Sequence, residues 1–426
     1  MGVLALNGGK PVRTAPFPVW PRAGAEERAW LERVLEGPRW FAGALGDDPD
    51  ALGTLFSQRF AEFVGVRHAL PVANGSVSLE IALRALRIGP GDEVIVPAYT
   101  YVSTATSVLM VGAVPVFADM ERSSYCLDPD DAERKITPRT RALIPVHLGG
   151  QMADMERLTS LVQRRGGLAI VEDAAQSIGA ACGGRMAGAW GALGSFSFQS
   201  NKTITSGEGG LLTTADDALA DRVKALRAVG RFPTPGATVA RSSALLAREL
   251  SSNYRLAEWQ SAVLLAQLER FPKQDAHRQA NAARLTQLLS EVPGVEHVHC
   301  ERKQGRHGYY YYLVRFDPQQ FAGLTPERLC QALNAEGIPF VPGDDAPIYR
   351  QPVFSPDNLR ASLPAETLRH YVAACNAAEP GCPVAEEACH CTLILRHQVL
   401  LGEPSDMEQI AEALMKVRAH ASELAR

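Results

Sequence analysis

The chain has 426 residues, of which 46% are hydrophobic and 21% charged, and its formal net charge is −4. This length exceeds what one hydrophobic core usually serves, so we expect two packed regions. Asp and Glu outnumber Lys and Arg by 47 to 43, which gives no general attraction for nucleic acid or an anionic membrane surface. No segment has the roughly 20 apolar residues that a membrane helix requires.

The start of the chain, Met1 to Gly9, has no basic leader, and Leu6 stands where a myristoylation signal needs Ser or Thr. We therefore expect a cytoplasmic protein with reduced thiols. The richest cysteine cluster lacks the Cys-x2-Cys repeats typical of structural zinc sites, so we expect no metal there. This cluster consists of Cys375, Cys382, Cys389, His390 and Cys391.

From Ser76 to about Arg270, short apolar runs alternate with amphipathic stretches, the pattern of an α/β domain whose strands are joined by crossover helices. The predicted strands are 93–96, 114–117, 142–146, 168–172, 196–198 and 210–213. The predicted helices are 76–86, 155–165 and 217–229. The first part of the chain thus predicts a sheet with polar residues at the strand ends.

A long amphipathic stretch, 257–289, leads to a second region with its own β-α alternation. There we expect a strand at 309–316 and helices at 326–336 and 406–418. The predicted division is a large domain over 1–270 and a smaller C-terminal α/β domain over 271–426. Pro and Gly between Gly230 and Gly236 indicate a loop, and we expect Arg231 to Ser251 to act as a lid.

The most informative segment is Gly194 to Gly210, GSFSFQSNKTITSGEGG, where an apolar strand leads through Ser197 to Lys202 in a glycine-rich turn. Burial at a strand end lowers the pKa of a lysine and provides a neutral amine, which a Schiff-base cofactor requires. A lysine on a surface loop is the more frequent explanation of such a residue by itself. The other motifs therefore decide between a cofactor lysine and a surface lysine.

A second motif is the run LAIVEDAAQSIG, a strand that ends in Asp173. A carboxylate there pairs with a protonated pyridine nitrogen and keeps the ring an electron sink for carbanion chemistry. The alternative is that Asp173 only caps a helix.

Two further segments fit the same cofactor. In ANGSVSLEIAL a helix begins at Gly75 and Ser76, whose free backbone N–H groups suit a phosphate, although many helices begin this way without a ligand. In PAYTYVST, Tyr101 has the shape to lie on an aromatic ring, although a core tyrosine is the commoner explanation.

Together these four segments resemble the DegT/DnrJ/EryC1/StrS family of sugar and aminocyclitol aminotransferases. The resemblance covers nearly the whole chain, from the Gly-Gly-Lys-Pro-Val-Arg opening at Gly8 to Arg396 and His397. It implies the fold of pyridoxal-phosphate-dependent transferases of fold-type I, with a mostly parallel mixed sheet. It also implies a homodimer with a shared active site.

The resemblance implies roles for individual residues. Lys202 would hold pyridoxal 5′-phosphate as a Schiff base and move the proton during transfer, and Asp173 would bind the pyridine nitrogen. Gln176 would bond the phenolic oxygen, and Tyr101 would stack on the ring. The residues implied at the phosphate are Gly75, Ser76 and Ser197, with Asn253 reaching over from the neighbouring subunit.

The opening and the Asn253-Tyr254-Arg255 run resemble most the branch of scyllo-inosose aminotransferases and 3-amino-5-hydroxybenzoate synthases. This predicts transfer from Gln or Glu to a keto-cyclitol or related cyclic ketone in secondary metabolism. The alternatives are a nucleotide-linked keto sugar as acceptor and a non-catalytic protein of the same fold.

A dinucleotide-binding oxidoreductase is a rival from another class, but Gly207 to Gly210 follow a lysine and precede an apolar strand, which is not the Gly-x-Gly-x-x-Gly arrangement. The roles of two histidines stay open. His147 and His397 either contact substrate or serve as structural residues, and we hypothesise a substrate contact for His147.

Overall fold

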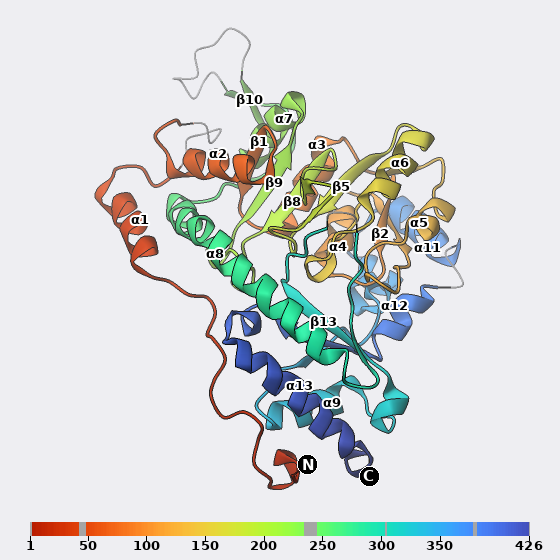
Figure 1. Ribbon diagram of the computed structural model, residues 1–426. Helices are drawn as coiled ribbons and strands as arrows, with labels where there is room; N and C mark the ends of the chain where they lie inside the picture. The colour runs from red at the N-terminus through yellow and green to blue at the C-terminus, as the bar shows by residue number, and fades with distance from the viewer. Residues whose placement is uncertain (1, 42–47, 234–244, 303–304, 378–380, 426) are drawn as a thin grey trace.

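The computed structural model describes residues 2–41, 48–233, 245–302, 305–377 and 381–425. Its centre is a seven-stranded sheet in the order β1-β9-β8-β5-β4-β2-β3 (Figure 1). The strands are β1 (His68–Val72), β2 (Glu93–Pro97), β3 (Val114–Ala118), β4 (Thr140–Leu143), β5 (Ala169–Asp173), β8 (Leu193–Ser197) and β9 (Gly210–Thr214). β9 runs antiparallel to both of its neighbours, β1 and β8, and the other adjacent strands are parallel, which confirms the predicted mostly parallel mixed sheet.

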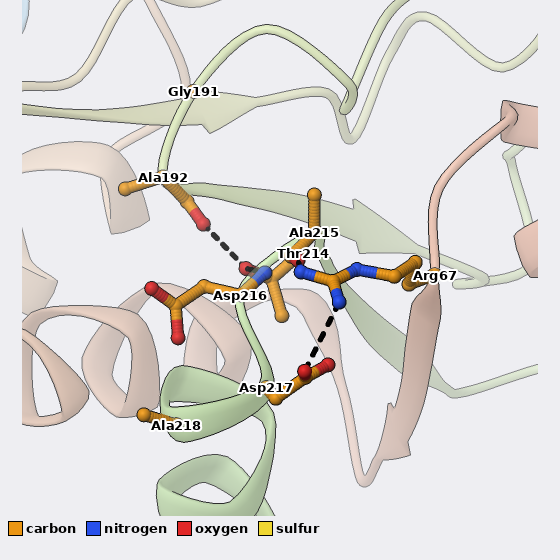
Figure 2. A pocket seen from close by; sticks show the side chains of 8 residues that line it. All are labelled: Arg67, Gly191, Ala192, Thr214, Ala215, Asp216, Asp217 and Ala218. Atoms are coloured by element: carbon orange, nitrogen blue, oxygen red, sulfur yellow. Dashed lines mark hydrogen bonds and ion pairs between the residues drawn. The ribbon is translucent and has the colours of Figure 1, made fainter.

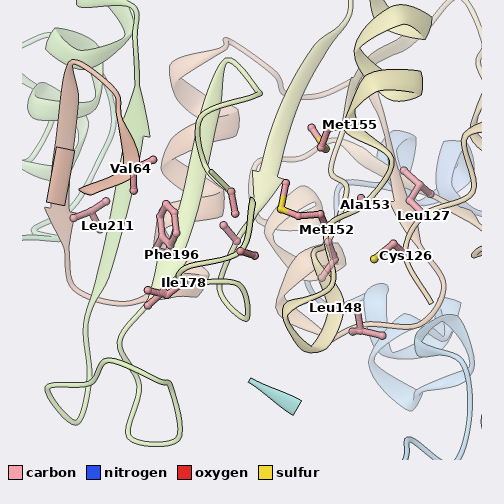
Figure 3. Close-up of a cluster of buried hydrophobic side chains, with 14 of the residues drawn as sticks. Val64, Cys126, Leu127, Leu148, Met152, Ala153, Met155, Ile178, Phe196 and Leu211 are labelled. Carbon is pink, nitrogen blue, oxygen red and sulfur yellow. The ribbon is translucent and has the colours of Figure 1, made fainter. Parts of the chain in front are cut away.

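Helices cover both faces of this sheet because alternate residues of each strand point to opposite sides. In β2, Val94 and Val96 join the core under α3, α4 and α7, whereas Ile95 joins the core on the other face, which includes α2, α6 and part of α8. Figure 3 shows part of this second core, with Phe196 of β8 and Leu211 of β9 among its members. The helices are α1 (Ala25–Glu36), α2 (Leu52–Val64), α3 (Gly75–Ala85), α4 (Ser103–Met110), α5 (Pro129–Arg134), α6 (Met155–Arg165) and α7 (Asp217–Arg227).

The C-terminal region is built on a four-stranded antiparallel sheet in the order β12-β13-β15-β14. Its main elements are α8 (Glu258–Leu289), β12 (Val295–His297), β13 (Tyr311–Phe316), α9 (Pro326–Ala335), β14 (Val341–Pro342), β15 (Thr392–Arg396) and α13 (Pro404–Ala419). The N-terminal segment belongs to this region, since Leu4 lies in its core and Arg13 pairs with Asp406 at 2.5 Å.

The remaining elements are short or peripheral. The helices are α10 (Pro356–Leu359), α11 (Ala365–Ala377), α12 (Pro383–Ala388) and α14 (Ala421–Leu424), and the short strands are β6 (Ala181–Cys182), β7 (Arg185–Met186), β10 (Arg231–Pro233) and β11 (Leu245–Ala247). The 3₁₀ turns are η1 (Ala5–Asn7), η2 (Leu148–Gly150), η4 (Pro318–Phe321), η5 (Ile348–Arg350), η6 (Pro352–Phe354) and η7 (Val399–Leu401). In the described part of the chain, no helix is long and apolar enough to cross a membrane.

Several predicted boundaries shift. The strand predicted at 142–146 is β4, which ends at Leu143 because Pro145 has no N–H to continue the ladder. The strand predicted at 196–198 is β8, which begins at Leu193. A Cβ on Gly194 would lie 2.4 Å from the Cα of Gly188, so the close packing of the strand requires glycine there.

Two further predictions concern the domain boundary and the lid. The proposed domain boundary at residue 270 falls inside the continuous helix α8 (Figure 1), so the division remains a prediction. The lid proposed over Arg231 to Ser251 lies largely outside the described residues, because 234–244 are not among them. Its described ends form the antiparallel pair β10 and β11.

Candidate active site

The predicted site residues gather where β5 and β8 end and α3 begins. Ser197 is the last residue of β8 and lies against Gly75, the first residue of α3, so closely that a Cβ on Gly75 would come within 2.7 Å of the Ser197 Cβ. Gly210 is equally tight, since a Cβ there would lie 2.3 Å from the Asn74 carbonyl oxygen. The two glycines thus bring the N-terminus of α3 onto the ends of β8 and β9.

Lys202 lies in the turn that follows β8, where its backbone N–H donates to the Gln199 carbonyl at 2.8 Å. The Nζ atom lies 4.2 Å from the centre of the Tyr310 ring and makes no hydrogen bond or ion pair within the described residues. Burial lowers the pKa of Lys202 to about 8, against a smaller opposing effect of the Asp173 charge. About a tenth of this amine is therefore neutral at pH 7, far more than of an ordinary lysine.

Asp173 ends β5 and is buried. The Thr104 hydroxyl donates to its Oδ2 at 2.8 Å, and the Ala175 backbone N–H donates to its Oδ1 at 3.2 Å. Burial raises the pKa of Asp173, while these hydrogen bonds and the charges of Lys202 and His147 lower it. A cation placed beside this carboxylate would offset the cost of its burial.

His147 and Glu172 form a buried layer beside Asp173. The His147 Nε2 lies 3.0 Å from Glu172, and the Nδ1 accepts the Ala153 N–H at 3.2 Å. Glu172 also accepts N–H groups of Gly188, Trp190 and Gly191. With both ring nitrogens occupied and no exposed surface, His147 is a structural residue, and the hypothesis that it contacts substrate is wrong.

The N-terminus of α3 has the form expected of an anion site. Asn74 caps the helix by accepting the Val77 N–H at 2.9 Å, which leaves the N–H groups of Gly75 and Ser76 without intrahelical acceptors. The Ser76 hydroxyl lies 2.7 Å from that of Ser103, at the start of α4. Two hydroxyls and two free N–H groups thus converge at one place.

Three other predicted residues are placed differently. The Gln176 Oε1 accepts the Gly149 N–H at 2.7 Å, which leaves its amide nitrogen free within the described residues. Tyr101 is 68% exposed, and its hydroxyl is close enough to Tyr310 to contribute, after burial and Tyr311, to raising the pKa of Tyr310. Asn253 is exposed and contacts Arg255 and Ala228, not the other predicted site residues.

Sequence reasoning missed three residues of this site, of which Ser103 lies at the start of α4 beside Ser76. Thr104 supports Asp173, and Tyr310 lies beneath the Lys202 amine. A signal existed for Thr104, which follows the predicted aromatic segment in PAYTYVST. Tyr310 gave no such signal, because it belongs to the C-terminal region and meets Lys202 only through the tertiary fold.

No metal site is apparent where the chain is described, since no three His, Cys, Asp or Glu side chains gather as a metal would require. A pocket does lie at the other end of the sheet, near the start of β8 and α7 (Figure 2). There Arg67 binds Asp217 at 3.0 Å, and the Thr214 hydroxyl binds the Ala192 carbonyl at 2.8 Å. Since these polar groups satisfy one another, this pocket provides no reactive group.

Comparison with known proteins decides the family. A profile of the DegT/DnrJ/EryC1/StrS aminotransferase family matches residues 24–415. The chain belongs to this family. It is therefore an aminotransferase, and the resemblance seen in the sequence is confirmed.

The sequence similarity to relatives within the family extends over nearly the whole length of each chain. The chain is 39% identical to the L-glutamine:2-deoxy-scyllo-inosose aminotransferase of Streptomyces lividus over 428 residues, and 37% identical over 424 residues to the enzyme of the same name from Streptoalloteichus tenebrarius. Each alignment covers 99% of both chains. The crystal structure of 3-amino-5-hydroxybenzoic acid synthase superposes with a TM-score of 0.82 at 32% identity, covering 96% of this chain and all of the other.

The site of this family member fits pyridoxal phosphate. A partly buried amine without a hydrogen-bond partner in the described chain, a buried carboxylate and a helix N-terminus with two free N–H groups lie at one end of one sheet. These are the three groups needed to bind an aldehyde, a pyridine nitrogen and a phosphate.

Proposed function

We propose that the protein transfers the α-amino group of L-glutamine to the ketone carbon of a cyclic polyol, with pyridoxal 5′-phosphate held at Lys202. The observation that carries the proposal is the Lys202 amine, whose pKa is lowered to about 8 and which makes no hydrogen bond to any described residue. The relatives named above, whose names specify L-glutamine and 2-deoxy-scyllo-inosose, indicate the substrate class. The reaction belongs to the biosynthesis of an aminocyclitol-type secondary metabolite.

The phosphate end of the cofactor would lie at the N-terminus of α3. Gly75 and Ser76 would donate their free N–H groups, and the hydroxyls of Ser76 and Ser197 would complete the site. An anion is favoured there by the helix dipole as well. The Gly75 contact with Ser197 supports this role, since a larger residue at 75 would open the site.

The ring end would lie over β5. Pyridoxal phosphate supplies an aldehyde carbon that takes up the amino group and a pyridine ring that stabilises negative charge on the substrate carbon. Asp173 would bind the protonated ring nitrogen, and this cation would offset the cost of burying the carboxylate. Gln176 would donate its free amide N–H to the phenolic oxygen, and Tyr101 would cover the ring.

The proton transfers fall to Lys202. A neutral Nζ takes the proton from the substrate α-carbon and later donates it at a second position. This is general acid/base catalysis by an amine whose pKa lies near the working pH. Tyr310 forms an apolar floor beneath Nζ and limits the access of water to it. The lowered pKa of Lys202 and the Tyr310 ring beneath its amine thus both favour this proton transfer.

Donor and acceptor need different partners, because glutamine carries a carboxylate and a keto-cyclitol carries only hydroxyls. Arg396 is exposed and forms no ion pair within the described chain. It is the cross-strand partner of Tyr311, so both side chains stand on the same face, and Tyr311 donates to Tyr310 at 3.2 Å. We assign the glutamine carboxylate to Arg396 and hydroxyl contacts to the two tyrosines.

The proposed enzyme is a homodimer with a shared site. Leu35, Trp40, Phe41 and Trp259 are 71%, 55%, 56% and 45% exposed, and the rings of Trp40 and Trp259 lie 5.9 Å apart. Exposed apolar groups gathered in this way are typical of a subunit interface. Asn253 lies a few residues before Trp259, and we propose that it reaches the phosphate bound by the partner subunit.

A cytoplasmic location suits this chemistry and the chain. All eight cysteines are free thiols, as a reducing compartment keeps them.

The proposal is tested by following the nitrogen atom. The enzyme is incubated with pyridoxal phosphate, 2-deoxy-scyllo-inosose and glutamine labelled with ¹⁵N in its amino group, and the cyclic product is analysed by mass spectrometry. We expect labelled aminocyclitol from the wild type and from Lys224→Ala, a surface control, and none from Lys202→Ala. Transfer only to a nucleotide-linked keto sugar would refute the acceptor class, and transfer to no ketone would refute the function.

A further inference from the structure

The turn that carries Lys202 is fixed by side chains from distant parts of the chain. The Nε1–H of Trp20 donates to the Lys202 carbonyl at 3.1 Å, and the Nε2 of His397 lies 3.1 Å from the carbonyl of Asn201, the preceding residue. Two consecutive carbonyls, one on each side of the Lys202 Cα atom, are therefore held from outside the turn.

The two side chains also contact each other. The Trp20 and His397 rings meet edge to face at a centroid distance of 4.6 Å. His397 is completely buried, and its backbone N–H donates to the carbonyl of Tyr310, the residue whose ring lies under the Lys202 amine. The support of the backbone and the floor beneath Nζ are thus one connected structure.

The protonation state of His397 follows from its surroundings. Burial, with the nearby Arg278 charge, holds the pKa of His397 well below its usual value, so the ring is neutral and carries one proton. A carbonyl oxygen only accepts hydrogen bonds, so that proton lies on Nε2, while Nδ1 has no partner. His397 is therefore a fixed hydrogen-bond donor, not an acid or base.

Trp20 reaches the turn from a segment anchored on both sides. Before it, Arg13 is bound to Asp406 of α13, and after it, the Arg22 carbonyl accepts from Gln267 of α8 at 3.0 Å. In Figure 1 this segment is the extended trace that leads from the C-terminal region to α1. The turn itself has no helix or strand between β8 and β9, so such contacts determine where it lies.

We propose that Trp20 and His397 are positioning residues for Lys202, which clamp the Asn201 and Lys202 carbonyls and thereby hold the amine over Tyr310. A lysine side chain has four rotatable bonds, so its Nζ returns to one place only if its backbone is fixed. The inference rests on the proposed function for its catalytic meaning, but the clamp itself is a property of the cofactor-free chain.

The variants separate the donor from the ring. Trp20→Phe keeps an aromatic side chain against His397 and removes the N–H. Trp190→Phe is the matched control, because the Trp190 indole also donates to a backbone carbonyl, that of Arg185, away from Lys202. His397→Leu removes the second donor, and His397→Gln restores an Nε2–H in the same place.

The decisive readout uses cofactor-free protein and acetylation of Lys202 by acetic anhydride, measured by peptide mass spectrometry across pH. Wild type and Trp190→Phe should show a labelling midpoint near pH 8, the value set by burial. Trp20→Phe and His397→Leu should move the midpoint upward by about half a unit or more, because a released amine regains water. His397→Gln should return it toward that of the wild type.

Activity then gives the second readout. Once loaded with pyridoxal phosphate, Trp20→Phe should lose about three- to tenfold in kcat, the effect of one lost hydrogen bond, with the KM for glutamine within twofold. Midpoints equal to the wild type in both Trp20→Phe and His397→Leu would overturn the clamp. Failure of the wild type to take up pyridoxal phosphate would instead refute the proposed function, and shifted midpoints would still support the clamp.

Discussion

The two ends of the central sheet differ in how their polar groups are satisfied. At the end where β5 and β8 finish, the Lys202 amine, the Gln176 amide nitrogen and the first N–H groups of α3 have no partners in the described chain. At the other end, around β9 and α7, Arg67, His68 and Asp217 bind one another. A pocket exists at this second end (Figure 2), but its polar groups already bind one another.

Under the proposed function, the chemistry lies at the end with unpartnered polar groups and not at the pocket. Folding normally pairs buried polar groups, so unpaired ones at a strand end cost stability and persist where a ligand completes them. In open α/β sheets, ligands also bind at the carboxyl ends of the strands, which is the end that carries Lys202.

The largest expected effect is that of removing the charge of Asp173. Asp173→Asn keeps the size of the side chain and an oxygen for Thr104, but leaves a cofactor ring nitrogen without its anion, so kcat should fall by about 100- to 1000-fold. Steady-state kinetics at saturating glutamine measures this. Asp216→Asn is the control at the other end, where Asn caps α7 as well as Asp does and activity should not change. Equal effects of the two would contradict the comparison.

A second effect is on stability and its pH dependence. The folded chain holds the pKa of Lys202 at about 8, below the value of about 10.5 in the unfolded chain. Between these values the unfolded state binds more protons, so the free energy of unfolding rises with pH across this window, and below pH 8 the full cost of burial remains. Cofactor-free Lys202→Met should therefore be more stable at pH 7 by about 1–3 kcal/mol.

Denaturant unfolding at pH 7, 8, 9 and 10 measures this gain. It should shrink steadily above pH 8, since the wild-type lysine then loses its proton in the folded state. A stability gain that stays constant with pH would mean that burial does not lower the pKa of Lys202.

A smaller effect is expected at the rim of the site. Arg396→Ala should raise the KM for glutamine about tenfold and leave kcat within about threefold, because one charged contact to the substrate is lost before and during the reaction alike. Arg315→Ala is the matched control on the same pair of strands, since Arg315 is already paired with Glu296. An unchanged KM in Arg396→Ala would remove this residue from donor binding.

The smallest effect is expected from Arg67→Ala at the other end of the sheet. Its pair with Asp217 is exposed, and exposed pairs contribute little in water. Both the melting temperature and kcat/KM should stay within experimental error of the wild type. A large loss of activity would show that the pocket of Figure 2 is part of the site.

Much of the fold was predictable because it depends on local patterns. Apolar runs such as Glu93–Pro97 and Gly210–Thr214 are buried strands, and helix α6 has the predicted bounds. The strand β1, His68–Val72, was not predicted. It contains Pro71, which is tolerated because β1 is an edge strand, and its pairing with β9 joins residues about 140 positions apart.

The site was predictable to the extent that its residues lie in short motifs. Asp173, Gly75 and Ser197 stand at the end of a strand or the start of a helix, and Lys202 follows in the turn after β8. The contacts of Trp20 and His397 with the Lys202 turn could not be predicted, since they join residues 182 and 196 positions apart. Nor did the strand pattern reveal that both nitrogens of His147 are occupied inside the protein.

The most direct test of the central claim is the visible absorption of purified protein after addition of pyridoxal phosphate, for wild type and Lys202→Ala. The account predicts a band of lysine-linked cofactor in the wild type that disappears when glutamine is added and returns when a keto-cyclitol follows. The variant should show only the spectrum of free cofactor. A wild type without a lysine-dependent band, or a variant whose band equals that of the wild type, would contradict the assignment of Lys202.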